Sequence, residues 1–241
     1  NQTSDPEKVI KTKRNLKNKM KLIHIFKKHN NSAELLSGIV LSYLLIAINV
    51  LSGIVLVPFI LKEMGANQFG IYSTATSFIS LFLVDLGLST ATTKFVSKYR
   101  VENSQEKINH LVSSVFKMYT VLSIIIFLIF SCMFFFLGNI FTKFEANEIE
   151  QLRLVYIMVA SYSVLSFPFV MLDGILIAYE KMFANKMADI ISKVIFIIVT
   201  ILGLVFHLGL YFLTACYLLH GFVGILIKIY FVKTKTPVKL L

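Results

Sequence analysis

Tryptophan is absent from this chain of 241 residues, and only two cysteines and four prolines occur. Cys132 and Cys216 stand far apart, with no further cysteine or histidine at metal-ligand spacing, so neither a disulfide nor a zinc site is expected. The Walker A, G-x-G-x-x-G, H-E-x-x-H and G-x-S-x-G motifs are all missing. These absences argue against catalysis, a bound metal or a nucleotide cofactor, and the chain is expected not to be an enzyme.

Charge is scarce as well, because only 15% of the residues are charged whereas 56% are hydrophobic, and the mean hydropathy is +0.77. The apolar residues form blocks of about 20 or more, the length a helix needs to cross a bilayer. Helices are preferred over strands because the blocks lack the alternation of a membrane barrel. We therefore expect an all-α integral membrane protein of six spans: Leu35–Leu61, Phe69–Thr93, Leu111–Gly138, Leu152–Tyr179, Met187–His207 and Leu210–Val232.

The basic residues predict the orientation of these spans. Of the 24 Lys and Arg residues, 18 fall on one side of the expected bundle and three on the other. By the positive-inside rule both termini are cytoplasmic, as an even number of spans requires. This pattern explains the net charge of +11 without a nucleic-acid partner. The remaining three, Lys117, Lys193 and Lys228, lie near cytoplasmic span ends, where snorkelling to the headgroups is the favoured interpretation.

The chain divides into a basic cytoplasmic segment (1–34), a transmembrane bundle (35–232) and a cytoplasmic tail (233–241). The first segment fits either a helix on the membrane surface or a disordered basic tail. In both cases anionic membrane lipids would attract its lysines.

Asp85 is the strongest candidate for a functional residue. It lies alone within the apolar run of the second span, and an ionised carboxylate within a bilayer costs a few kcal/mol. Such a group usually faces a wet cavity or a partner, and a cavity-facing position is favoured here. The alternatives are a buried ion pair and a protonated acid in an apolar site.

Three further residues within the spans are candidates. Asp173 is a second acidic residue in a span, although it lies close to the expected interface at Tyr179. Pro168 removes a backbone donor from the same helix, and the resulting bend is either a hinge or a static kink. Asn49 lies in the middle of the first span, where it either contributes to a cavity or joins two helices. His220 is expected to be a packed neutral histidine rather than a proton relay.

Several short motifs together resemble a known family. They are Pro58–Leu61, Met64–Tyr72, Asp85–Leu88, Lys94–Arg100 and Gly174–Ala184. Their order and spacing are similar to those of the N-terminal part of the polysaccharide biosynthesis flippases, which export lipid-linked oligosaccharides such as O-antigen units and belong to the multidrug/oligosaccharidyl-lipid/polysaccharide exporter superfamily. The likeness extends from about Leu35 to Val232.

The resemblance implies a bacterial plasma (inner) membrane protein that moves its cargo without chemistry. The cargo of the family is an undecaprenyl-pyrophosphate-linked oligosaccharide, whose sugar crosses the membrane by alternating access in a cavity between two lobes. Asp85 matches the acidic residue in the second helix of the family. No cofactor is implied, and a coupling proton or sodium ion is left open.

The chain resembles one lobe of such an exporter. The resemblance therefore implies that transport needs a second lobe, either a partner chain or another copy in a homodimer. Two alternatives remain open: a cation-coupled multidrug exporter of the same superfamily, and an inactive half or partner-binding membrane protein.

Overall fold

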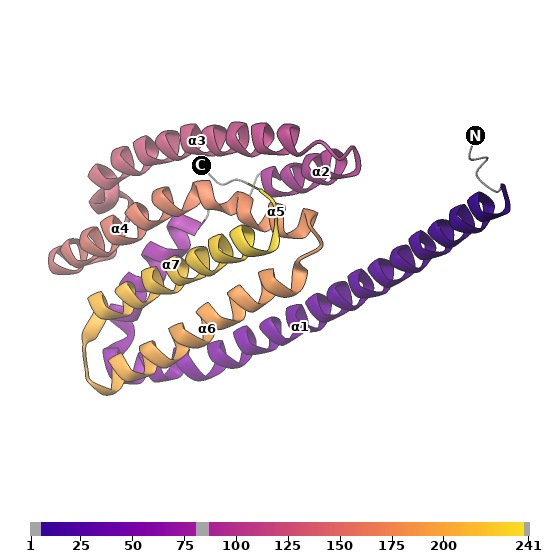
Figure 1. Ribbon diagram of the computed structural model, residues 1–241. Helices are drawn as coiled ribbons and strands as arrows, with labels where there is room; N and C mark the ends of the chain where they lie inside the picture. Colours follow the sequence, from indigo (N-terminus) through magenta and orange to yellow (C-terminus); the bar gives the residue numbers. More distant parts are fainter. Residues whose placement is uncertain (1–5, 81–86, 239–241) are drawn as a thin grey trace.

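The computed structural model describes residues 6–80 and 87–238, and within these residues it contains helices and no strands (Figure 1). The helices are α1 (Pro6–Ser80), α2 (Leu88–Val101), α3 (Gln105–Ile140), α4 (Ala146–Ser166), the 3-10 helix η1 (Phe167–Val170), α5 (Met171–Ala178), α6 (Met182–Val205) and α7 (Gly209–Lys235). The all-α architecture expected from the sequence is confirmed.

Helix α1 contains two helices joined at a bend. Gly65 has φ 82° and ψ 163°, which are not helical values, and the chain turns there into the segment that ends at Ser80. A residue with a Cβ rarely adopts this conformation, so glycine permits the turn between the first two expected spans. Before this bend α1 is continuous from Pro6, so residues 6–34 extend the first span as helix and project away from the bundle (Figure 1).

Five helical stretches of the described chain are long and apolar enough to cross a bilayer: Ala33–Ser77, Gln105–Ile140, Ala146–Ala178, Met182–Val205 and Gly209–Lys235. The first of these stretches includes the Gly65 bend, so it holds the first expected span and the start of the second. The second expected span then passes through residues 81–86, which lie outside the described residues, into α2. The chain is thus a multi-pass membrane protein of about six spans.

The outer surface of the bundle is apolar, as a lipid environment requires. On α1, Leu36 is 63% exposed, Val40 65% and Tyr43 71%. A water-soluble protein rarely exposes apolar side chains in so continuous a patch. These side chains would therefore lie against hydrocarbon rather than water.

Described parts of the segments that the charge pattern assigns to the cytoplasm meet at one end of the bundle. Lys181 Nζ pairs with Glu34 Oε2 at 2.7 Å, and this contact joins the α5–α6 turn to α1. Gln105 Nε2 donates to the carbonyl of Pro237 at 3.1 Å, which brings the C-terminal segment to the start of α3. The expected alternation of the loops is therefore present, while the direction of the bundle in a membrane stays a prediction.

The opposite end holds the remaining described turns. His207 Nδ1 lies 3.4 Å from Glu63 Oε2, so the α6–α7 turn meets the end of the first span. Glu145 and Glu148 form a capping box that begins α4.

The fourth expected span is not one regular helix. It consists of α4, the 3-10 helix η1 and α5 in succession, with Pro168 in η1. Proline has no N–H to donate to the carbonyl four residues earlier, that of Val164. The Ser123 hydroxyl on α3 donates to that carbonyl at 2.7 Å instead. The change of helix type therefore has a chemical cause, and a neighbouring helix satisfies the freed acceptor.

Candidate substrate cavity

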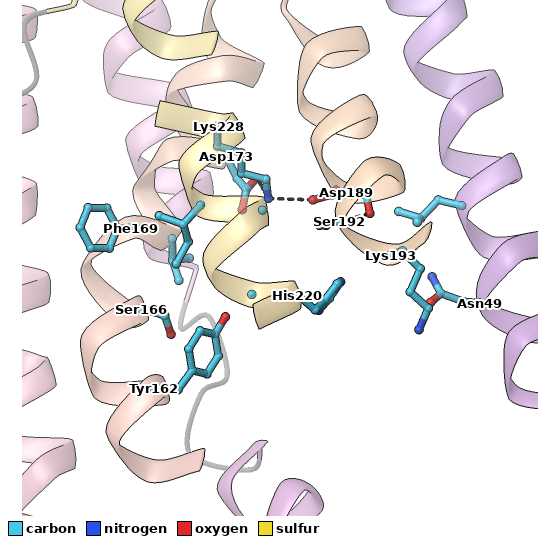
Figure 2. Close-up of a pocket in the computed structure, with 15 residues that line it drawn as sticks. Asn49, Tyr162, Ser166, Phe169, Asp173, Asp189, Ser192, Lys193, His220 and Lys228 are labelled. Atoms are coloured by element: carbon cyan, nitrogen blue, oxygen red, sulfur yellow. Dashed lines mark hydrogen bonds and ion pairs between the residues drawn. The ribbon is translucent and has the colours of Figure 1, made fainter. Parts of the chain in front are cut away.

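A polar cavity of about 340 Å³ lies between α1, α4, η1, α5, α6 and α7. Helices from both ends of the chain contribute to it, and its polar lining (Figure 2) consists of Asn49, Tyr162, Ser166, Asp173, Asp189, Ser192, Lys193, His220 and Lys228. The volume falls within the range of small-molecule sites, which is roughly 300–1,000 Å³. The cavity supplies carboxylate, ammonium, amide, hydroxyl and imidazole groups inside an otherwise apolar bundle.

Lys228 connects three helices at one side of the cavity (Figure 2). Its ammonium lies 2.7 Å from Asp173 Oδ1 on α5 and 2.8 Å from Asp189 Oδ1 on α6. The lysine side chain is only 15% exposed, so water screens these contacts weakly. Removing charges from water is costly, and such a group therefore fixes the relative position of the helices more than it adds to stability.

The charges of this cluster are nearly balanced. Lys186 Nζ lies 3.5 Å from Asp189 Oδ2, so a second ammonium accompanies the second carboxylate. Asp173 and Asp189 keep 33% and 26% of their side chains exposed, which leaves each carboxylate accessible from the cavity. A polar ligand can therefore hydrogen-bond to these carboxylates at a site whose net charge is small.

The other side of the cavity is less charged. Lys193 places its ammonium 5.2 Å from the centre of the Phe196 ring, and the His220 ring lies 5.5 Å from the same ring. The Tyr162 ring lies directly against Gly221, where a Cβ would overlap it. Glycine at that position lets α4 and α7 approach closely enough to bring Tyr162 to the cavity wall.

The cavity lies toward the end of the bundle that the charge pattern assigns to the cytoplasm. Asp189 follows Lys181 by eight residues, which corresponds to roughly 12 Å along a helix. Lys193 lies one helical turn deeper than Asp189. Asp189 is therefore nearer to that end of α6 than to the opposite one, and Lys193 lies at the middle of the helix.

The structure brings two of the predicted residues together, because Asp173 and Asn49 both line the cavity. Pro168 lies in η1 between two cavity-lining stretches of the chain, and its role as a hinge stays a prediction. Asp85, the first candidate from the sequence, lies outside the described residues.

Sequence reasoning missed Asp189 and misjudged Lys228. Snorkelling was the favoured interpretation for Lys228, and it is wrong, because the ammonium is held between two carboxylates inside the bundle. Lys117 is exposed, in keeping with that interpretation, whereas Lys193 lines the cavity. The available signal was that Asp173, Asp189 and Lys228 all lie within a few residues of the same end of their expected spans.

Among residues 6–80 and 87–238, no three His, Cys, Asp or Glu side chains are grouped so that they could hold a metal ion. Of the two free cysteines, Cys132 is exposed and Cys216 is buried, and neither lines the cavity.

The sequence model of the polysaccharide biosynthesis protein family matches residues 35–239. The chain belongs to this family. Every described residue that lines the cavity falls inside the matched range, so the cavity is part of the region that this chain shares with the family. No curated protein and no solved structure gave a significant match.

Proposed function

We propose that this polysaccharide biosynthesis protein moves the sugar head of a lipid-linked oligosaccharide across the bacterial plasma membrane. The observation that carries the proposal is the polar cavity inside a bundle whose outer surface is apolar. Sugar hydroxyl groups both donate and accept hydrogen bonds, and carboxylate, amide and hydroxyl side chains around the cavity supply matching partners. The lipid tail would stay in the bilayer against the exposed apolar surface.

The transport step is alternating access without covalent chemistry. The cavity is nearer to one end of the bundle, where a cargo from the cytoplasmic leaflet would enter. The state that opens to the opposite side of the membrane is formed together with a second lobe. This lobe is either another copy of this chain or a partner. Undecaprenyl pyrophosphate is the proposed lipid carrier, and membrane lipids surround the assembly.

The test reconstitutes the full chain in liposomes, together with any membrane protein encoded beside it. The probe is an undecaprenyl-pyrophosphate oligosaccharide with a fluorophore on its sugar, and an impermeant reductant bleaches only the fluorophore outside. We expect a larger bleached fraction than in empty liposomes, with no change for labelled phosphatidylcholine. Equal bleaching of both lipids, or none beyond empty liposomes, would contradict the proposal.

The carboxylates in the cavity keep one second candidate open, a cation-coupled exporter of small molecules. Asp173 and Asp189 are groups that bind protons or sodium ions, although Lys228 now lies between them. The same liposomes with an imposed sodium or proton gradient distinguish the two. Efflux of a cationic dye driven by the gradient, without oligosaccharide movement, would favour the exporter.

A further inference from the structure

Helices α2 and α5 are joined tightly along their length. Gly174 on α5 lies so close to α2 that a Cβ there would come within 2.6 Å of the Ser89 carbonyl oxygen. The Thr93 hydroxyl donates to the Gly174 carbonyl at 3.1 Å. Backbone contact of this kind cannot slide without losing a hydrogen bond and the close fit of the two helices.

Arg100 closes the other end of the same contact. Its Nη1 donates to the Ala178 carbonyl at 2.6 Å, and its Nη2 pairs with Glu180 at 3.1 Å. The guanidinium also lies 5.5 Å from the centre of the Tyr179 ring. One arginine therefore caps the end of α5 from α2, and the two helices form a single α2–α5 unit.

The link between this unit and α4 is weaker. The 3-10 helix η1 separates α4 from α5, and Pro168 cannot donate to the Val164 carbonyl. Ser123 donates to that carbonyl instead. The hydrogen bonds of α4 are therefore kept whether or not α5 runs in the same direction as α4. A 3-10 stretch within a longer helix is a place where the axis can bend at low cost.

On its other side the unit meets α7 through both packing and charge, since Ile175 of α5 and Val232 of α7 belong to one buried hydrophobic cluster. Lys228 of α7 binds Asp173 of the unit at 2.7 Å, and it binds Asp189 of α6 at 2.8 Å. The first ion pair crosses from the unit to the bundle, while the second joins two helices that both lie outside the unit. The same ammonium thus makes two contacts of different kinds.

We infer that α2 and α5 move as one unit about η1 and that Lys228 is a positioning residue, which holds the unit against α7 through Asp173. This inference rests on the proposed transport for its purpose, because release of the unit would change the cavity wall that α5 provides. A polar cargo that binds Lys228 or Asp173 would compete with their ion pair. Cargo binding and helix movement would then be linked by one charge contact.

Two alanine variants separate the two contacts of Lys228. Asp173→Ala removes the contact between the unit and α7, and Lys228 keeps Asp189 as its partner. Asp189→Ala removes the contact outside the unit, and Lys228 keeps Asp173. Neither variant leaves the lysine without a carboxylate, so both are expected to fold, and Asp189→Ala is the matched control.

The experiment measures spin-label distances by pulsed electron paramagnetic resonance on the full chain, with Cys132 and Cys216 replaced by alanine. The moving pair carries labels at Val101 on α2 and Tyr230 on α7, which are 83% and 62% exposed. The reference pair keeps the label at Tyr230 and places the other at Phe183 on α6, which is 44% exposed.

We expect Asp173→Ala to add a second, displaced population to the 101–230 distances and to leave the 183–230 distances unchanged. Asp189→Ala should leave both distributions as in the parent chain. The inference is overturned if the two variants change the 101–230 distances equally, if neither changes them, or if the reference pair changes as well. Because distances are measured without cargo, a negative flipping assay does not decide this result, and the two proposals fail separately.

Discussion

The two halves of this bundle use different forces, although the same helices pass through both. Toward the end expected in the cytoplasm, helices are joined by ion pairs and side-chain hydrogen bonds, such as those of Arg100, Lys181 and Lys228. Toward the other end, α3 and α4 meet through aromatic rings, with Phe130 and Tyr156 centred 6.1 Å apart at 76°. Most ion pairs of the described residues thus lie toward the end where the cavity lies, whereas the opposite end combines the contact of His207 and Glu63 with aromatic packing.

The largest effect on stability is expected from Lys228→Met, at the end of the bundle expected in the cytoplasm. It leaves Asp173 and Asp189 in the cavity wall with one ammonium fewer, and an uncompensated buried charge costs about 3–5 kcal/mol. We expect about 3 kcal/mol, because both carboxylates are partly exposed. Thermal unfolding in detergent measures the loss.

Lys117→Met is the matched control, since Lys117 is an exposed lysine in a span. We expect no loss of stability for it. A similar drop for both variants would show that the Lys228 cluster has no special role.

The next effect is steric and concerns the contact between α2 and α5. Gly174→Ala places a methyl group 2.6 Å from the Ser89 carbonyl oxygen, and overpacking of this kind costs about 1–3 kcal/mol. Gly53→Ala is the control, because nothing lies within 4 Å of its Cβ position. There alanine should be neutral or stabilising in the helix. Equal unfolding temperatures for the two variants would contradict the close contact.

Ser123→Ala tests the hydrogen bond that accompanies Pro168. It leaves the Val164 carbonyl without its side-chain donor, and an unsatisfied buried acceptor costs about 1–3 kcal/mol. Pro168→Ala restores a backbone N–H that can reach the same carbonyl. In the double variant the cost of Ser123→Ala should therefore largely disappear, and a double-mutant cycle measures this coupling. Strict additivity would contradict the assignment.

The smallest effect is expected at the end of the bundle where α3 and α4 meet through aromatic rings. The Tyr156 hydroxyl donates to the Phe130 carbonyl at 3.0 Å, and Tyr156→Phe removes that bond while keeping the ring. A single hydrogen bond contributes about 1 kcal/mol. A loss as large as that of Lys228→Met would show that the two halves do not differ in the way described.

Much of this fold follows from patterns along single helices. The apolar blocks predicted the spans, and the distribution of lysines predicted which turns meet, as the contact of Glu34 with Lys181 illustrates. Pro168 predicted the interruption of its helix, because a missing N–H is a property of one residue.

The cavity was only partly predictable. Asp173 and Asn49 are recognisable from the sequence because polar groups in apolar spans are unusual. The cluster of Lys228, Asp173 and Asp189 depends on how α5, α6 and α7 are rotated about their axes relative to one another. That rotation cannot be predicted from a single sequence. Each charge taken alone also fits a position near the headgroups, which is why the snorkelling interpretation was preferred for Lys228.

The hydrogen bond from Ser123 to the Val164 carbonyl also matters for a helix surrounded by lipid. A helix with an internal proline carries an open carbonyl, and hydrocarbon offers it no donor. That carbonyl becomes satisfied once α3 lies beside α4. In the membrane, the backbone of α4 thus depends for this hydrogen bond on a serine of α3 that is distant from the proline in the sequence.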